Sequence, residues 1–236
     1  MVEWLRRRED IIYGSNHRTI RSRRSCPPLH REDMLVLGLT GSIGTGKSNV
    51  TRVLRELGAE VIDADQVGHE AYIPHTESWN EVVDAFGRDI LQPDGEIDRR
   101  KLGAIVFADA GQMTKLNGIM HPRMAAMVAE KIGQMRSQGV QVVVVEAALM
   151  FEAGWETLVD EVWATASPLE TVFQRLMSRN GLDEAEVRKR IGSQMDIQER
   201  LDRADVVVEN SGAVADLEAT VRSLWESRVK GRVEQT

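Results

Sequence analysis

Cysteine is almost absent from this sequence of 236 residues, in which Cys26 is the only one. A single cysteine excludes an intramolecular disulfide and a cysteine-based metal site, and it is typical of a reducing compartment, so we expect a cytoplasmic protein. Long apolar runs are lacking too. The longest, at residues 142–151, is interrupted by Glu146 and is too short to span a bilayer. We therefore expect no membrane association.

Basic residues are in the minority, with 30 Lys and Arg against 37 Asp and Glu and a net charge of −7. Residues 1–33 hold eight arginines against five acidic residues, whereas the remainder has 22 basic and 32 acidic residues. An acidic body argues against broad nucleic-acid binding. The length and the 42% hydrophobic content suit one large domain, or a core with a small inserted unit.

Residues 1–33 differ from the rest of the chain, because they combine clustered arginines, two prolines and little periodicity, which favours disorder. A basic targeting or nucleic-acid-binding tail is the alternative, although Glu3, Glu9 and Asp10 argue against a transit peptide. Met34 stands directly before the first predicted strand and is a candidate start. We predict that residues 1–33 pack against nothing and that residues 34–236 form the functional domain.

A glycine-rich segment at residues 41–48, GSIGTGKS, matches the phosphate-loop pattern G-x-x-x-x-G-K-[S/T] in full. It lies between an apolar stretch at 34–39 that predicts a buried parallel strand and a predicted helix at 51–58. Its glycines allow turns that a Cβ would block, so successive N–H groups can point at a polyphosphate. Lys47 would reach the β- and γ-phosphates, and the Ser48 hydroxyl would ligate Mg²⁺. The sequence therefore predicts a nucleoside triphosphate site.

Two acidic residues, Asp63 and Asp65, lie at and just beyond the end of the second predicted strand, which covers residues 59–63. In an open parallel α/β sheet the carboxyl ends of the strands line the ligand crevice, so Asp63 would share an edge with the phosphate loop. Asp63 could accept a proton from an attacking hydroxyl or bind the Mg²⁺ hydration shell, and the alternative is a helix cap. We favour the functional role for Asp63 and leave both roles open for Asp65. His69 lies one turn beyond Asp65 on the same helix face, where a plain surface residue is the alternative.

Residues 75–138 are helical in pattern and contain no strong strand. Apolar residues at three- and four-residue spacing predict four helices, at 77–86, 99–107, 110–119 and 122–138. So many helices between two strands predict a helical subdomain at about 70–138. Proline suits a first helical position, so Pro122 would begin the last helix with His121 as its cap and Arg123 facing the crevice.

A buried strand at residues 140–145 ends in Glu146, which is the Walker B arrangement, where the acid holds the Mg²⁺ shell. The alternative is a strand that simply ends at its first exposed position. Two more strands are predicted at 160–166 and 204–210, and helices at 169–179 and 214–229. Arginines 175, 179, 188 and 190 cluster near Gln194. They form either a solvated helix face or a mobile lid, at about 179–200, that neutralises charge during phosphoryl transfer.

Two functions fit these features, a small-molecule kinase and a nucleotide-driven switch or motor. No Lys-x-Asp sequence for reading guanine and no LSGGQ signature occurs, so the kinase is favoured. In these features the chain resembles the dephospho-coenzyme A kinases over residues 34–230. The resemblance rests on GLTGSIGTGKS at 38–48, IDAD at 62–65 and DGEIDRRKLGAIVF at 94–107, and on the later segments LNGIMHP, EAALMFEAGW and NSG, in that order and spacing.

This resemblance implies transfer of the ATP γ-phosphate to the ribose 3′-hydroxyl of dephospho-CoA, the last step of coenzyme A biosynthesis. It implies a three-layer α/β P-loop kinase fold with a five-stranded parallel sheet, a helical CoA-side subdomain and a lid. ATP would be bound, with Mg²⁺, by loop residues, namely Gly41, Gly44, Thr45, Gly46, Lys47, Ser48 and Asn49. Asp63, Lys47 and Arg179 would be catalytic, and Ser48 and Glu146 would hold the metal. Acceptor contacts would come from Asp65, His69, His121, Arg123, Arg175 and Gln194.

The chain departs from the family pattern at Asn49, where a threonine is usual, and at Glu146-Ala-Ala148, which replaces a commoner Asp-x-Pro. Residues 1–33 have no counterpart in the family core. None of these departures removes a group that the chemistry needs. We expect a monomer or a weak homo-oligomer.

Overall fold

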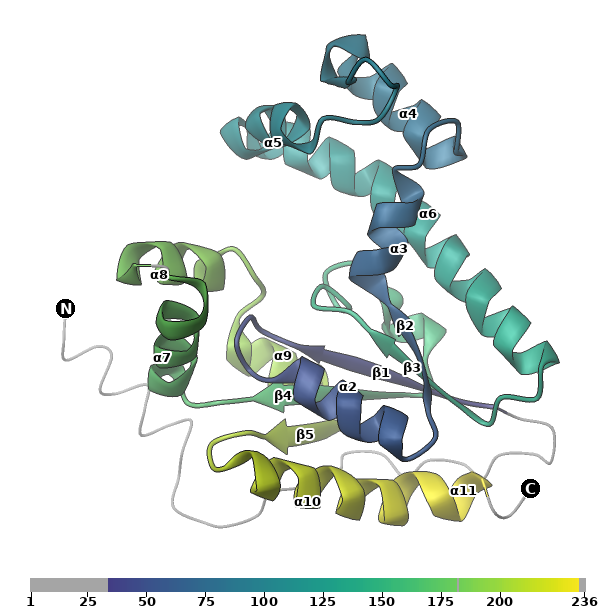
Figure 1. The fold of residues 1–236 in the computed structure, drawn as a ribbon, viewed down its shortest axis with the longest axis vertical. Helices are drawn as coiled ribbons and strands as arrows, with labels where there is room; N and C mark the ends of the chain where they lie inside the picture. The colour runs from purple at the N-terminus through teal and green to yellow at the C-terminus, as the bar shows by residue number, and fades with distance from the viewer. Residues whose placement is uncertain (1–33, 182, 234–236) are drawn as a thin grey trace.

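The computed structural model describes residues 34–181 and 183–233, apart from the side chains of residues 179 and 180. The predictions for residues 1–33 lie outside this part. Five parallel strands form one sheet in the order β2-β3-β1-β4-β5 (Figure 1). These strands are β1 (Leu35–Gly41), β2 (Glu60–Asp63), β3 (Val142–Glu146), β4 (Glu161–Ala166) and β5 (Val206–Glu209). The five-stranded parallel sheet that the resemblance implies is confirmed.

Helices cover both faces of the sheet, which explains why every residue of the central strand β1 is buried. On one face, α2 (Lys47–Glu56) and α10 (Val214–Leu224) lie side by side and share a core with Leu37 and Trp163. The other face packs against the second half of α6 (Ala110–Ser137) and against α9 (Ile197–Arg203). The result is a three-layer α/β fold.

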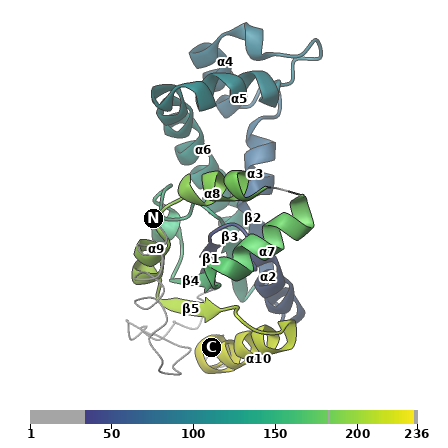
Figure 2. The ribbon, with the colours of Figure 1, turned by 90° about the vertical axis from the view of Figure 1, so that its left-hand side faces the viewer.

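A group of helices projects away from the carboxyl edge of the sheet (Figures 1 and 2). It consists of α3 (Ala64–Ala71), α4 (Glu77–Phe86), α5 (Arg99–Ala108) and the first half of α6. These helices have a hydrophobic cluster of their own, separate from the two sheet cores, which includes Ala71, Val82, Leu102, Val106 and Met120. A separate core lets this unit keep its shape while it stands off from the sheet.

The prediction of two helices at 110–119 and 122–138 is wrong, because α6 runs without a break through Pro122. Asp109, not His121, caps the helix, since its Oδ1 accepts from the Gly111 N–H at 2.7 Å. A proline inside a helix costs about 3 kcal/mol. That cost is offset because α6 is buried on both sides of Pro122, by Leu116 in the projecting cluster and by Val128 against the sheet.

Two further helices, α7 (Leu169–Asn180) and α8 (Glu184–Gly192), stand at the carboxyl edge on the β4 side. They are joined by a small apolar cluster of Val172, Leu176 and Val187, against which Ile43 packs.

The closing helix is more varied than predicted, since α10 passes into a π-helical turn at Trp225–Lys230 and then into α11 (Gly231–Val233). In the part of the chain that the structure describes, none of the helices combines the length and the apolar character that a membrane span requires.

Candidate active site

The phosphate loop connects β1 to α2 and takes the backbone shape that its glycines allow. Gly41 has φ 151° and Gly46 has φ 99°, in a region that side chains disfavour. A Cβ on Gly41 would lie 2.0 Å from Thr165 Oγ1, and one on Gly46 would lie 2.1 Å from Asn210 Nδ2. Both glycines are therefore required by conformation and by close packing.

The start of α2 is open to an anion. No side chain caps this helix, and among the described residues no hydrogen-bond acceptor is recorded for the backbone N–H groups of Gly44, Gly46, Lys47 and Ser48. Unsatisfied N–H groups and the positive end of the helix dipole together favour a bound phosphate. Thr45 has a different position, because its buried hydroxyl bonds to Ser42 O at 2.7 Å and to Thr165 Oγ1 at 2.6 Å. The Thr45 side chain therefore stabilises the loop conformation and ties the loop to Thr165 of β4.

Lys47 lies folded over the loop, and its Nζ donates to Gly41 O at 2.8 Å. Burial lowers the pKa of Lys47, and nearby Arg200 lowers it further, whereas the carboxylates of Glu146 and Asp65 raise it. Both Glu146 and Asp65 therefore act electrostatically on Lys47.

Glu146 ends β3 directly beside Asp63 of β2 and Leu39 of β1 in the strand register. Its Oε2 accepts from the buried Thr51 hydroxyl at 2.6 Å, which fixes the carboxylate at the edge facing the loop. Ser48, on the first turn of α2, is exposed. A hydroxyl and a carboxylate are hard oxygen ligands of the kind that Mg²⁺ prefers.

Asp63 is the N-cap of α3, since its Oδ1 accepts from the N–H groups of Asp65 at 2.8 Å and Gln66 at 3.4 Å. The structure therefore shows Asp63 as a helix cap, which is the alternative role that the sequence left open. Asp63 does not line the neighbouring cavity, whereas Asp65 does. Of the two aspartates, it is therefore Asp65 that faces the cavity.

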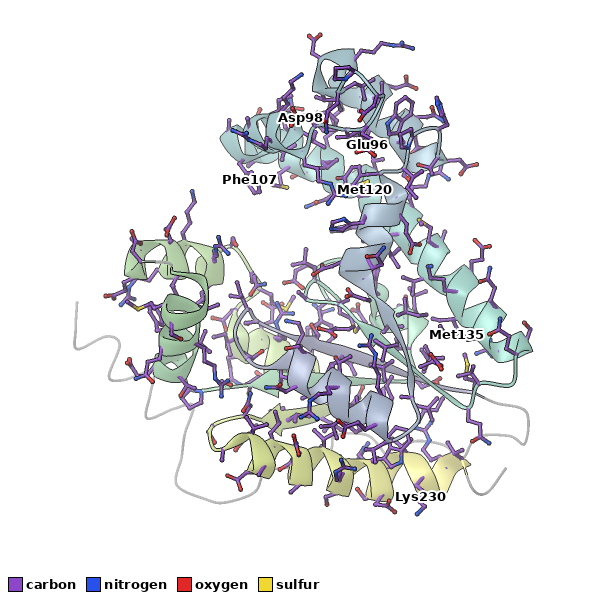
Figure 3. The ribbon with its side chains drawn as sticks, in the orientation of Figure 1. Glu96, Asp98, Phe107, Met120, Met135 and Lys230 are labelled. Carbon is purple, nitrogen blue, oxygen red and sulfur yellow. The ribbon has the colours of Figure 1, made fainter. Side chains whose placement is uncertain are left out.

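That cavity has a volume of about 380 Å³ and lies between α3, the start of α5, α6 and the segment after β3. It brings together three of the predicted acceptor residues, Asp65, His69 and His121. Apolar side chains such as Met120 form much of the rest, and Met120 lies where α6 passes α3 (Figure 3). Burial lowers the pKa of His121 against the opposing effect of Glu152, so its imidazole is neutral at pH 7.

Other predicted residues lie elsewhere. Arg123 does not line the cavity and is ion-paired with Glu77 and Glu81, which ties α6 to α4. The Gln194 Oε1 accepts from the Ile43 N–H of the phosphate loop at 3.0 Å. The half-buried Asn49 side chain has no hydrogen-bond partner among the described residues.

Arg175 also contacts the loop, where it donates to Gly44 O at 3.3 Å and to Asn210 Oδ1 at 3.2 Å. Arg179 is on α7, but its side chain is outside the described part of the chain.

Three residues of this edge were missed as site residues. Thr51 is one turn beyond Lys47 on α2, so helical spacing alone could have indicated that it faces the same side. Asn210 follows β5, and its Nδ2 donates to Thr45 O at 2.9 Å. Arg200 is only 1% exposed and donates to Thr40 Oγ1, to Ala148 O and to Glu152. No sequence signal marks a buried arginine within a charged helix.

Known proteins match this chain over the same region. A profile of the dephospho-CoA kinase family matches residues 35–216. The dephospho-CoA kinase of Geobacter sulfurreducens is 43% identical over 195 residues, which cover 83% of this chain and 99% of that protein.

Two solved structures are similar as well, each over 83% of this chain and 98% of the other. One is a crystal structure of a Thermus thermophilus protein, with 31% identity and a TM-score of 0.70. The other is the dephospho-CoA kinase of Campylobacter jejuni, with 28% identity and a TM-score of 0.64.

Proposed function

This chain belongs to the dephospho-CoA kinase family, and from that premise we propose how its own residues carry out the reaction. It is an ATP-dependent kinase that phosphorylates dephospho-CoA in coenzyme A biosynthesis, with the γ-phosphate passing to the ribose 3′-hydroxyl. The observation that carries the mechanism is the position of Asp65, which lines the cavity between α3 and α6 and also acts electrostatically on Lys47 of the phosphate loop.

Asp65, rather than Asp63, is the group that receives or orients the proton of the 3′-hydroxyl. Both Asp63 contacts are accepted by Oδ1 from the backbone of α3, so this oxygen is committed to the helix start. Asp65 has no such commitment among the described hydrogen bonds, lines the cavity and acts electrostatically on Lys47. A base must be within hydrogen-bond reach of the proton it takes, which makes position the first criterion.

The phosphate loop binds ATP through its free N–H groups, with Lys47 contacting the β- and γ-phosphates. Stabilisation of the transferring phosphoryl group comes mainly from such fixed positive groups, since this transition state has little covalent chemistry to assist. Arg175 and Asn210 support the far side of the loop through Gly44 and Thr45 and are positioning residues for ATP.

Mg²⁺ would be held by the Ser48 hydroxyl and, through its water shell, by Glu146. Among the described residues there is no group of three or more His, Cys, Asp or Glu side chains that could hold a metal alone. A Mg²⁺ ion that arrives with ATP needs only one or two protein groups, so this oxygen donor set fits. When bound, the ion neutralises charge on the β- and γ-phosphates.

The acceptor lies in the cavity between α3 and α6, where His69 and His121 border it, and the projecting helices at about 70–138 form the CoA-side subdomain. Residues 179–200 act as the lid and carry Arg179 towards the phosphates. Phe107 is 83% exposed on the side of α5 that faces the sheet and α8 (Figure 3), which suits a surface that the lid approaches. Exclusion of water by such a closure prevents wasteful hydrolysis.

The decisive assay measures ADP release by the full chain with ATP and Mg²⁺. The acceptors to compare are dephospho-CoA, shikimate, adenosine, a nucleoside monophosphate and none. We expect ADP only with dephospho-CoA, and CoA as the product. A comparable rate without any acceptor would contradict the proposal and favour a nucleotide-driven switch.

The same assay on residues 34–236 tests the prediction that residues 1–33 are dispensable, which fails if activity is confined to the full chain.

Location in the cytoplasm, independence from nucleic acid and a monomeric or weakly oligomeric state are further proposals. Size-exclusion chromatography with light scattering checks the oligomeric state.

A further inference from the structure

We propose that Arg99 is a specificity-determining residue that binds the pyrophosphate of the acceptor through its guanidinium, held in place by His69 and Tyr72. The inference rests on the proposed function, because it takes dephospho-CoA as the acceptor. It concerns a residue outside the predicted site, which reaches the cavity from the start of α5.

The charge of the cavity is the first observation. Among the described residues that line it, Asp65 is the only acidic residue and Arg99 is the only arginine or lysine. Dephospho-CoA carries a pyrophosphate whose negative charge must be matched somewhere in the acceptor site. Arg99 is the cation that the cavity offers, and a guanidinium suits phosphate oxygens because its N–H groups form a planar fork.

Among the described residues, no carboxylate neutralises Arg99. Within the described part of the chain it takes part in no ion pair, whereas Arg123 is paired with both Glu77 and Glu81. The recorded contact of the Arg99 guanidinium is from Nη1 to His69 Nε2, at 3.0 Å. A guanidinium has five N–H donors, so most of them remain available to a ligand.

The guanidinium is held without losing charge. Arginine can only donate, so His69 must accept at Nε2 and carry its own proton on Nδ1. The Arg99 Cζ also lies 5.2 Å from the centre of the Tyr72 ring, a cation–π distance. Tyr72 is itself neutral, because burial raises its pKa against the opposing charge of Arg99. These contacts already restrict the Arg99 side chain, so it loses less conformational entropy when a ligand binds.

Spacing along α3 matches the substrate. Asp65 and His69 are one helical turn apart, which is a rise of about 6 Å, and Arg99 joins the cavity at His69. In dephospho-CoA the 3′-hydroxyl and the 5′-pyrophosphate are attached to the same ribose. A ribose with its 3′-hydroxyl at Asp65 can therefore direct its 5′-pyrophosphate towards Arg99.

The test compares Arg99→Gln with Arg100→Gln in the full chain. Arg100 is the next residue of α5, is exposed, does not line the cavity and has no described side-chain contact, so it controls for the loss of one positive charge. We expect Arg99→Gln to raise KM for dephospho-CoA roughly 10- to 100-fold, as for the loss of charged hydrogen bonds, with KM for ATP unchanged. Arg100→Gln should change neither value by more than about twofold.

Adenosine, used as a poor acceptor without phosphates, provides the second readout. Arg99→Gln should leave kcat/KM for adenosine unchanged while it lowers the value for dephospho-CoA, so that the preference for the pyrophosphate-bearing acceptor shrinks. Equal losses with both acceptors, or equal effects of the two arginine variants, would overturn the inference. If the unmodified chain does not phosphorylate dephospho-CoA, the proposed function itself fails, and this result is distinct from a normal KM in Arg99→Gln. If adenosine is not turned over, calorimetric binding of dephospho-CoA to both variants decides the question.

Discussion

Lys47 lies where function and stability oppose each other. Burial lowers its pKa below the ordinary 10.5, so the folded state disfavours the charged amine that ATP binding requires. Between the folded-state pKa and 10.5 the unfolded chain binds more protons, so the free energy of unfolding rises with pH in that window. The phosphate of ATP would relieve this penalty.

We therefore expect Lys47→Met to lower kcat on the order of a thousandfold, from lost charge stabilisation, without lowering the melting temperature at pH 7 in the absence of ATP. The pH dependence of stability above neutrality should also flatten. Steady-state kinetics and differential scanning calorimetry check both statements. A clear drop in melting temperature would show that the hydrogen bond from Lys47 to Gly41 outweighs the cost of burial.

The two aspartates after β2 allow a clean separation of roles. Asparagine caps helices as well as aspartate does, so Asp63→Asn should leave both stability and kcat nearly unchanged. Asp65→Asn removes the proposed proton acceptor and should lower kcat about 10²- to 10⁴-fold, with KM for ATP unchanged. Stopped assays with dephospho-CoA at saturation measure the difference. A reversed pattern would return the catalytic role to Asp63.

Local sequence located the phosphate loop because its function depends on backbone shape, which glycine spacing records directly. The choice between Asp63 and Asp65 could not be made in that way, since both lie at the junction of a predicted strand and a predicted helix. It depends on which carboxylate accepts hydrogen bonds from the first N–H groups of α3, and in the structure this is Asp63. Arg99 was missed for a similar reason, because 30 residues separate it from His69, the partner that reveals its position.

Helix α6 shows how packing overrides a local signal. Proline at an N-terminal helix position and proline inside a helix look alike in sequence, and local sequence favours the first kind for Pro122. Burial of Leu116 and Val128 on either side keeps the helix continuous. Periodicity predicted strands and amphipathic helices well because it reports burial, but it carried no information on whether two helical segments are joined.

Replacing the proline should therefore stabilise the protein. We expect Pro122→Ala to raise the free energy of unfolding by about 2 kcal/mol, which is the helix cost of proline less its entropic benefit in the unfolded chain. Gly133→Ala is the control, since nothing lies within 4 Å of the added Cβ and helix propensity alone predicts about 1 kcal/mol. Urea unfolding measures both. A smaller gain at Pro122 than at Gly133 would mean that the backbone there is already adapted to proline.

Several parts of the molecule meet at Arg200, which lies on α9 at the end of the proposed lid. Its buried guanidinium donates to Thr40 at the end of β1 and to Ala148 O after β3, and it is ion-paired with Glu152 at 2.7 Å. Glu152 also accepts from the Met195 N–H. The buried Arg200 guanidinium thus connects β1 with the segment after β3, and Glu152 connects that segment with Met195 of the proposed lid.

Removing one partner of a buried ion pair leaves the other uncompensated, whereas removing both is far less costly. Arg200→Met should therefore lower the free energy of unfolding by about 3 kcal/mol, and the double variant Arg200→Met/Glu152→Gln should recover most of that loss, because glutamine still accepts from the Met195 N–H. Urea unfolding of the single and double variants measures the coupling.

Activity should respond differently from stability. The double variant lacks the cation that links α9 to β1, so kcat should stay low even where stability is recovered. Parallel recovery of kcat would instead show that Arg200 acts only through folding and that the lid needs no fixed connection to the central strand.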